Sequence, residues 1–62
     1  MDQIEREGWE RRFSKMKDER VFEWLMSARR YRKEAVIRGN EEDADYWQEV
    51  KKMAIAELDR RE

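Results

Sequence analysis

The chain has 62 residues, of which 15 are basic and 16 acidic, so half of it is charged and the formal net charge is −1. This length limits it to one small domain that buries only about 60% of its unfolded surface. It contains no Cys, His, Pro or Thr, which excludes a disulfide framework, a thiolate metal site and the commonest general base.

The N-terminal segment is the least regular part of the chain. Its apolar positions on one face are Trp9, Phe13 and Met16. Ile4 points away from that face, and Gly8 interrupts the pattern at a cost of about 1 kcal/mol relative to Ala. The stripe is rotated by roughly a quarter to a third of a turn from the stripe that follows. This phase jump predicts a helix over about residues 2–16 and a break after it, with Asp18 as the next N-cap; one long bent helix is the alternative.

The second segment has a helical period over about residues 19–38. Its main stripe consists of Val21, Leu25, Ala28, Ala35 and Val36. Trp24 and Tyr31 extend one edge of this stripe, and the apolar positions towards the other edge are Phe22, Met26 and Ile37. Arg32 falls within the stripe, where its methylenes can lie on apolar surface while its head reaches water or a carboxylate.

The clearest break is Gly39-Asn40. Gly suits the left-handed position just past a helix, and Asn is a good N-cap. The acids that follow are Glu41, Glu42 and Asp43, which match the positive end of a helix dipole. The third helix is therefore expected over residues 41–60. Its apolar arc covers about half the circumference, which indicates contact from more than one side, and contains Ala44, Tyr46, Trp47, Val50, Met53, Ala54, Ile55 and Leu58.

Charge placement also favours helices and their antiparallel order. Acid-before-base pairs at i, i+4 are Asp2–Arg6, Glu7–Arg11, Glu34–Arg38 and Glu57–Arg61, each worth about 0.2–0.5 kcal/mol. A hairpin folded at residues 39–40 brings the bases Arg32, Lys33 and Arg38 near the acids Glu41, Glu42, Asp43 and Asp45. We expect these two patches to cancel largely. The fold class is thus all-α: a small three-helix bundle or a bent antiparallel helical hairpin, which dimerisation would complete if an apolar face stays uncovered.

The sequence lacks the combinations of residues that usually carry out catalysis. Besides two tyrosines, the only hydroxyls belong to Ser14 and Ser27, and neither has a His to activate it. The acids at residues 41–45 lack the ligand spacing and central Gly of a calcium loop. We therefore expect no enzyme, metal, cofactor or small-molecule substrate.

The aromatic and Met content points to protein binding instead. Trp, Tyr and Arg are frequent at interface hot spots, and a wide apolar face suits the helix-in-groove mode of binding. The positions least easily placed between the last two helices are Trp9, Phe13, Met16, Phe22, Met26 and Ile37. We expect these to form a protein interface, with another protein or with a second copy of the chain.

The rival prediction is nucleic-acid binding. Basic side chains can contact phosphates, and an aromatic residue between them, here Tyr31, can stack a nucleobase. The basic residues are Arg29, Arg30, Arg32 and Lys33, within the basic segment 29–38. Membrane binding is not expected, because no apolar run approaches the roughly 20 residues of a spanning helix and every polar face mixes acids and bases.

No family motif stands out in the sequence. Gly8 within a helix, only two Leu and four Met favour a natural small regulator, such as a phage or mobile-element product, over a designed miniprotein. A de novo helical miniprotein and a structural oligomer without another partner remain the alternatives. Without a signal peptide's apolar core after Met1, the expected setting is cytoplasmic.

Overall fold

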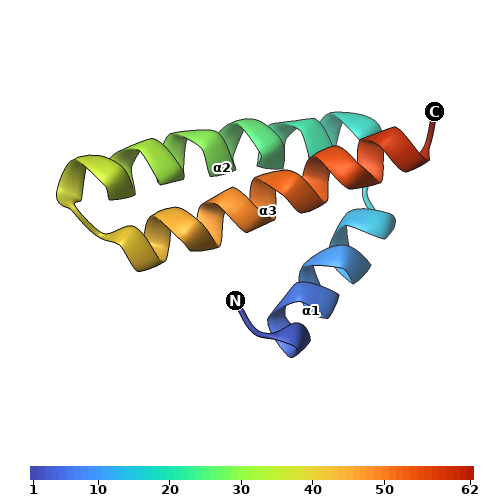
Figure 1. Ribbon diagram of the computed structural model, residues 1–62. Helices are drawn as coiled ribbons and strands as arrows, with labels where there is room; N and C mark the ends of the chain where they lie inside the picture. Colours follow the sequence, from blue (N-terminus) through green and yellow to red (C-terminus); the bar gives the residue numbers. More distant parts are fainter.

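The computed structural model describes all 62 residues and contains three α-helices and no strand. The helices are α1 (Gln3–Ser14), α2 (Asp18–Arg38) and α3 (Glu41–Arg60). Figure 1 shows α2 and α3 side by side as an antiparallel hairpin, with the shorter α1 running below α3. The predicted all-α three-helix fold is therefore confirmed, although α1 is shorter at both ends than the expected range 2–16.

The turn between α2 and α3 is built as the sequence predicts. Gly39 has a φ of 75°, a left-handed conformation that glycine adopts without the clash of a Cβ. Its N–H donates to Val36 O (3.0 Å), and the next N–H, that of Asn40, donates to Ala35 O (2.9 Å), which is the Schellman pattern. The Asn40 side chain accepts a hydrogen bond from the Asp43 N–H (3.1 Å). Two adjacent residues thus end α2 and begin α3.

The link between α1 and α2 covers residues 15–17, where the phase jump predicts a break. Asp2 caps α1 by accepting a hydrogen bond from a backbone N–H of its first turn (2.8 Å). The prediction that Asp18 caps α2 is wrong: Lys17 holds the cap position without a side-chain hydrogen bond, and Asp18 is the first helical residue. The Asp18 carboxylate instead pairs with Arg61 (2.7 Å), a contact that only the tertiary fold creates.

The core is small and lies where the three helices meet. It consists of Trp9, Phe13, Val21, Ala28, Val50, Met53 and Ala54. The facing sides of α2 and α3 also bury Ala35 and Ala44 near the turn, and such small side chains let two helices approach closely. The large volumes in the core come mainly from α1, so this short helix fills the space that the hairpin leaves.

Three positions depart from the periodicity of the sequence. Val36 and Ile55 were expected in the seam between α2 and α3, yet they are 56% and 40% exposed. Glu57 is only 6% exposed, although its charge predicts a solvated position. The physical reason is the position of α1: it covers one side of the hairpin only, so apolar residues towards the other side stay in solvent.

Only one of the four predicted i, i+4 ion pairs forms, between Glu57 and Arg61 (2.9 Å). Arg6 pairs with Glu49 of α3 (3.1 Å) rather than with a neighbour in its own helix. Arg38 likewise pairs across the turn with Asp43 (3.7 Å). An exposed ion pair within one helix contributes too little free energy to compete with an oppositely charged partner that the packing of the helices brings close.

Candidate protein-binding face

The α2–α3 hairpin has two sides, and α1 covers only one of them. We call the covered side the closed face. On it, Trp9 packs edge-on against Trp24 of α2 (ring centroids 5.1 Å apart) and Trp47 of α3 (6.4 Å). The Trp9 indole N–H also donates to the Tyr46 hydroxyl (2.9 Å), which satisfies a polar group that burial would otherwise penalise. A single α1 residue thus contacts both helices of the hairpin.

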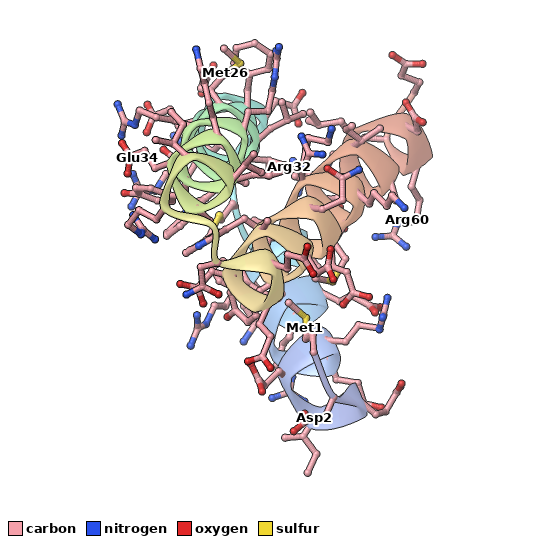
Figure 2. The ribbon with its side chains drawn as sticks, turned by 60° about the vertical axis from the view of Figure 1, so that its left-hand side comes forward. Met1, Asp2, Met26, Arg32, Glu34 and Arg60 are labelled. Carbon is pink, nitrogen blue, oxygen red and sulfur yellow. The ribbon has the colours of Figure 1, made fainter.

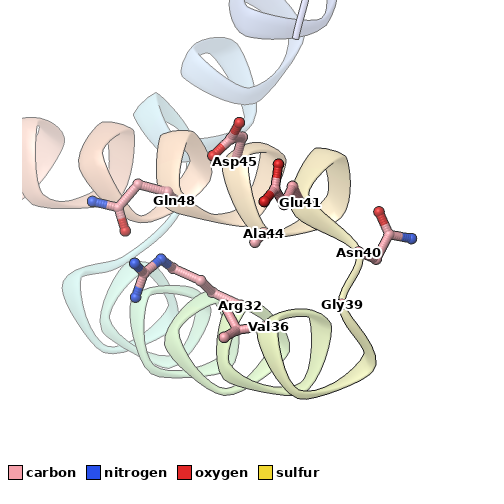
Figure 3. A pocket seen from close by; sticks show the side chains of 8 residues that line it. All are labelled: Arg32, Val36, Gly39, Asn40, Glu41, Ala44, Asp45 and Gln48. Atoms are coloured by element: carbon pink, nitrogen blue, oxygen red, sulfur yellow. The ribbon is translucent and has the colours of Figure 1, made fainter.

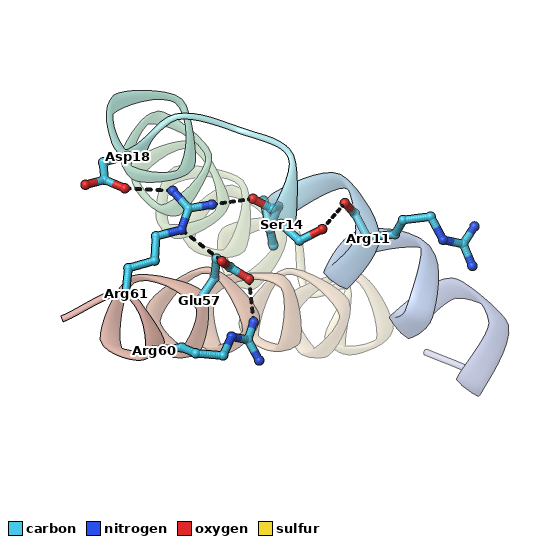
Figure 4. Close-up of polar contacts among 7 residues, drawn as sticks. Arg11, Ser14, Asp18, Glu57, Arg60 and Arg61 are labelled. Atoms are coloured by element: carbon cyan, nitrogen blue, oxygen red, sulfur yellow. Dashed lines mark hydrogen bonds and ion pairs between the residues drawn. The ribbon is translucent and has the colours of Figure 1, made fainter.

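A charged cluster fastens the other end of α1 to the hairpin (Figure 4). Arg61, just past α3, donates to Glu57 Oε2 (2.9 Å), to Asp18 Oδ1 of α2 (2.7 Å) and to the backbone oxygen of Phe13 in α1 (2.7 Å). Arg60 donates to the second oxygen of Glu57. One guanidinium therefore joins all three helices, which fits its fixed fork of donors.

Glu57 is the acid at the centre of this cluster. The hydrogen bond from Arg60 lowers the pKa of the Glu57 carboxyl below its ordinary value of 4.5, and Arg61 adds to this effect although burial opposes it. Hydrogen bonding and nearby positive charge favour the ionised form. Its polar contacts are with Arg60 and Arg61 of the same chain, so we assign Glu57 a structural role. We call Glu57 and its two arginines the clasp.

The opposite side of the hairpin, which we call the open face, has no covering helix. At about 100° per residue, its α2 residues lie within roughly a 140° arc whose centre is nearly opposite Trp24 and Tyr31. In Figure 2 Met26 stands on the side of α2 away from α1, and Arg32 extends from α2 towards α3. The open face consists of Phe22, Met26, Arg29, Arg32, Lys33, Val36 and Ile37 of α2, with Lys51 and Ile55 of α3.

Large apolar side chains are exposed along the open face. Phe22 is 54% exposed, Met26 45% and Ile37 76%, in addition to Val36 and Ile55. The only other large exposed apolar side chain is Ile4 of α1, at 81%, which stands alone. Several large exposed apolar residues on one face are informative, whereas single exposed residues are normal.

Along α2, cations separate Phe22 and Met26 from Val36 and Ile37. A shallow groove of about 590 Å³ is lined by Arg29, Arg32, Lys33, Val36, Ile37 and Lys51. No carboxylate lines it, and none of its four cations takes part in an ion pair. The middle of the open face is therefore positively charged and uncompensated.

The groove continues towards the turn into a second hollow of about 490 Å³ (Figure 3). Arg32 and Val36 face Ala44 and Gln48 across it, and Glu41 and Asp45 stand at its α3 edge. The other end of the open face is also acidic, because Phe22 and Leu58 there share a shallow hollow with three carboxylates, those of Asp18, Glu19 and Glu23. The positive zone is thus bounded by acids at both ends.

The structure divides the predicted interface residues into three groups. Phe22, Met26 and Ile37 lie on the open face and are available to a partner. Trp9 and Phe13 are 7% and 0% exposed. Their assignment to a partner surface is therefore corrected to the core, because α1 turns its aromatic stripe inwards onto the hairpin. Met16, in the α1–α2 link, is half-buried against the core and offers little surface.

The basic residues also differ from expectation. The predicted cancellation across the turn is limited to the exposed Arg38–Asp43 pair, while Arg32 and Lys33 have no ion-pair partner. Arg30 lies over the Tyr31 ring (5.5 Å), and that ring packs on Trp47 (4.8 Å). The aromatic residue expected to stack a base is thus occupied within the fold.

Sequence reasoning missed three members of the open face. Val36 and Ile55 carry a core-like signal in their own helices, and Lys51 carries none. Only the position of α1 decides which edge of each apolar arc is covered. The width of the arcs, which exceeds what one helix contact covers, was the one available signal that part of them stays exposed.

No group of His, Cys, Asp or Glu residues is placed to hold a metal ion, and no helix is long and apolar enough to cross a membrane. Comparison of the chain with protein-family models, with curated proteins and with solved structures finds no match.

Proposed function

We propose that the chain is a non-enzymatic protein-binding module that acts through its open face. The observation that carries this proposal is the row of large apolar side chains on the outer side of α2, from Phe22 to Ile37, all at least 45% exposed. Folding leaves this surface in water although burying it is favourable at roughly 25 cal/mol per Å². A partner that covers it would gain that free energy.

The test uses amphipathic helical peptides as probes, because an exposed helix stripe beside a groove suits helix-in-groove binding. Peptides with one apolar face are titrated against the protein, and binding is followed by amide chemical shifts. Binding should move the signals of α2 residues on the open face. The double variant Phe22→Ser/Ile37→Ser should lose this binding, since hot-spot side chains cost at least about 2 kcal/mol each when truncated.

Ile4→Ser provides the matched control, because Ile4 is as exposed and apolar but lies on α1 away from the open face. This variant should bind as the wild type does. If the peptides do not bind, or if the open-face variant binds them equally well, the proposed function is wrong.

Nucleic-acid binding is the second candidate function. The four uncompensated cations of the groove support it, whereas the packed Tyr31 ring and the flanking acids oppose it. A mobility shift with single-stranded and duplex DNA or RNA at two salt concentrations decides between the two. Phosphate binding should weaken steeply with salt and disappear in Arg29→Ala/Lys33→Ala, which removes two of the groove cations.

Self-association is the remaining form of protein binding. Sedimentation over a range of concentrations distinguishes it, because a dimer dissociates on dilution by mass action. A concentration-independent monomer would exclude a structural oligomer and leave a different protein as the partner.

A further inference from the structure

We infer that the partner of the open face is an acidic amphipathic α-helix, about four turns long, that lies along α2 over the groove. This inference rests on the proposed function and specifies the chemistry of the partner. It is drawn from the charge, the apolar pattern and the length of the open face.

The charge of the groove selects an acidic partner. Arg29, Arg32 and Lys33 reach it from α2 and Lys51 from α3, with no acid among the lining residues. Like charges held this close repel one another, and a carboxylate placed between them gains interactions with several cations at once. Each exposed contact is worth only about 0.2–1 kcal/mol, so the four together decide selectivity more than affinity.

The apolar residues select a helix over a nucleic acid. Phe22 and Met26 lie on one side of the cations along α2, and Val36 and Ile37 lie on the other, with Val36 and Ile37 also lining the groove. A nucleic acid could stack a nucleobase on Phe22, but it offers no apolar group to cover the aliphatic side chains of Val36 and Ile37. An amphipathic helix brings apolar and acidic residues to one face and can cover both. The distance from Phe22 to Ile37 along α2 is about 22 Å, which equals roughly 15 residues of a partner helix.

The flanking acids limit the length of the acidic segment. Glu19 lies beside Phe22, Glu41 and Asp45 lie near the turn, and none of these three acids has an ion-pair partner. Asp18 and Glu23 also lie beside Phe22, but they are paired with Arg61 and Arg20. A long polyanion or an anionic membrane surface would meet these carboxylates at both ends of the positive zone. A helix with its acids near the middle avoids that repulsion.

A second copy of the chain fits this pattern less well. The open face extends from residue 22 to residue 37, so a twofold axis through its centre passes near residues 29 and 30. Two copies related by that axis would place Arg29 against Arg29, and like charges juxtaposed across an interface disfavour the pairing.

The experiment compares three synthetic helical peptides of about 18 residues that share one Leu face and carry Glu, Gln or Lys beside it. Binding is measured by calorimetry at low and at physiological salt. The Glu peptide should bind about tenfold tighter than the Gln peptide at low salt and the Lys peptide should bind weakest. The advantage should shrink as salt screens the exposed charges.

Charge reversal on the open face provides the internal check. Arg29→Glu/Lys33→Glu leaves the groove with two positive and two negative charges. The Glu peptide should therefore lose its advantage over the Gln and Lys peptides, and circular dichroism should show unchanged helicity because both side chains are exposed. Arg11→Glu/Lys15→Glu makes the same change in net charge on α1 and in the link after it, with residues that are also exposed and unpaired. This control should retain the order of the wild type.

Each other outcome overturns the inference in a recognisable way. Equal binding of the Glu and Gln peptides that Phe22→Ser/Ile37→Ser still abolishes would leave protein binding intact and reject the acidic partner. Tighter binding to single-stranded DNA or to phosphatidylserine vesicles would identify the wrong class of partner. A dimer in sedimentation that the Glu peptide fails to dissociate would make a second copy the occupant. Failure of all three peptides would reject the proposed function itself.

Discussion

The closed and open faces of the hairpin both carry apolar and charged residues, but the apolar residues of the closed face are buried and those of the open face are exposed. On the closed face, Trp and Phe side chains from α1 fill the space between α2 and α3, and one arginine joins the three helices. On the open face, Phe, Met, Val and Ile side chains of α2 remain in solvent beside four unpaired cations. The short α1 is thus long enough to cover one side of the hairpin, and the apolar residues on the other side stay exposed.

Two phenylalanines give the largest expected contrast between the faces. Phe13→Ala removes a fully buried ring and should lower the free energy of unfolding by about 3–5 kcal/mol, most of the roughly 3–9 kcal/mol that a chain of this length holds. Phe22→Ala should cost less than about 1 kcal/mol, because more than half of that ring is already exposed. Urea denaturation followed by circular dichroism measures both. Similar losses for the two variants would remove the distinction between the faces.

The next largest effect on stability is expected at the clasp on the closed face. Glu57→Gln should lower the free energy of unfolding by about 1–3 kcal/mol at neutral pH, because it takes the carboxylate from a buried site that two arginines share. Glu10→Gln, at an exposed position of α1, should change stability little. If the free energy of unfolding of Glu57→Gln equals that of the wild type, the cluster does not hold α1 on the hairpin.

The same clasp predicts a pH dependence. The folded-state pKa of Glu57 lies below its unfolded value, so the ionised carboxylate stabilises the fold above about pH 4.5 and this contribution is lost as the pH falls through the lower folded-state pKa. Thermal unfolding from neutral to acidic pH should therefore show a smaller fall in Tm for Glu57→Gln than for the wild type. An equal fall in both would place the acid sensitivity elsewhere.

Gly8→Ala should strengthen the closed face. Gly8 lies within α1, and a Cβ added there would meet no atom within 4 Å. The substitution should raise the free energy of unfolding by about 0.5–1 kcal/mol, since Ala loses less backbone freedom in a helix than Gly. A higher urea midpoint is the expected result, and a lower one would mean that α1 needs the missing side chain.

The smallest effect on stability is expected on the open face itself. Ile37→Ser should change the free energy of unfolding by no more than about 0.5 kcal/mol, because the side chain is 76% exposed. Its effect on peptide binding should be larger than its effect on stability. A substantial loss of stability would show that Ile37 supports the fold and is not held for a partner.

Local sequence signals account for the three helices and the turn between the last two. Gly39 adopts the left-handed conformation that its missing side chain allows, and the Asn40 side chain caps α3. The acids after Asn40 match the start of a helix, and the phase jump after Met16 locates the break before α2. These features depend on residues within a few positions of one another. Sequence periodicity also predicted that the apolar arcs are too wide for one contact.

Which edge of each apolar arc is buried depends instead on how the three helices pack. Trp9 and Phe22 carry the same apolar signal, yet α1 turns one into the core while the other stays in water. Arg61 reaches Asp18, 43 residues away, in place of the cap that Asp18 was expected to form. The physical reason is that capping and periodicity are local, whereas the side of the hairpin on which α1 packs depends on the fit of whole surfaces, which no single segment of the chain contains.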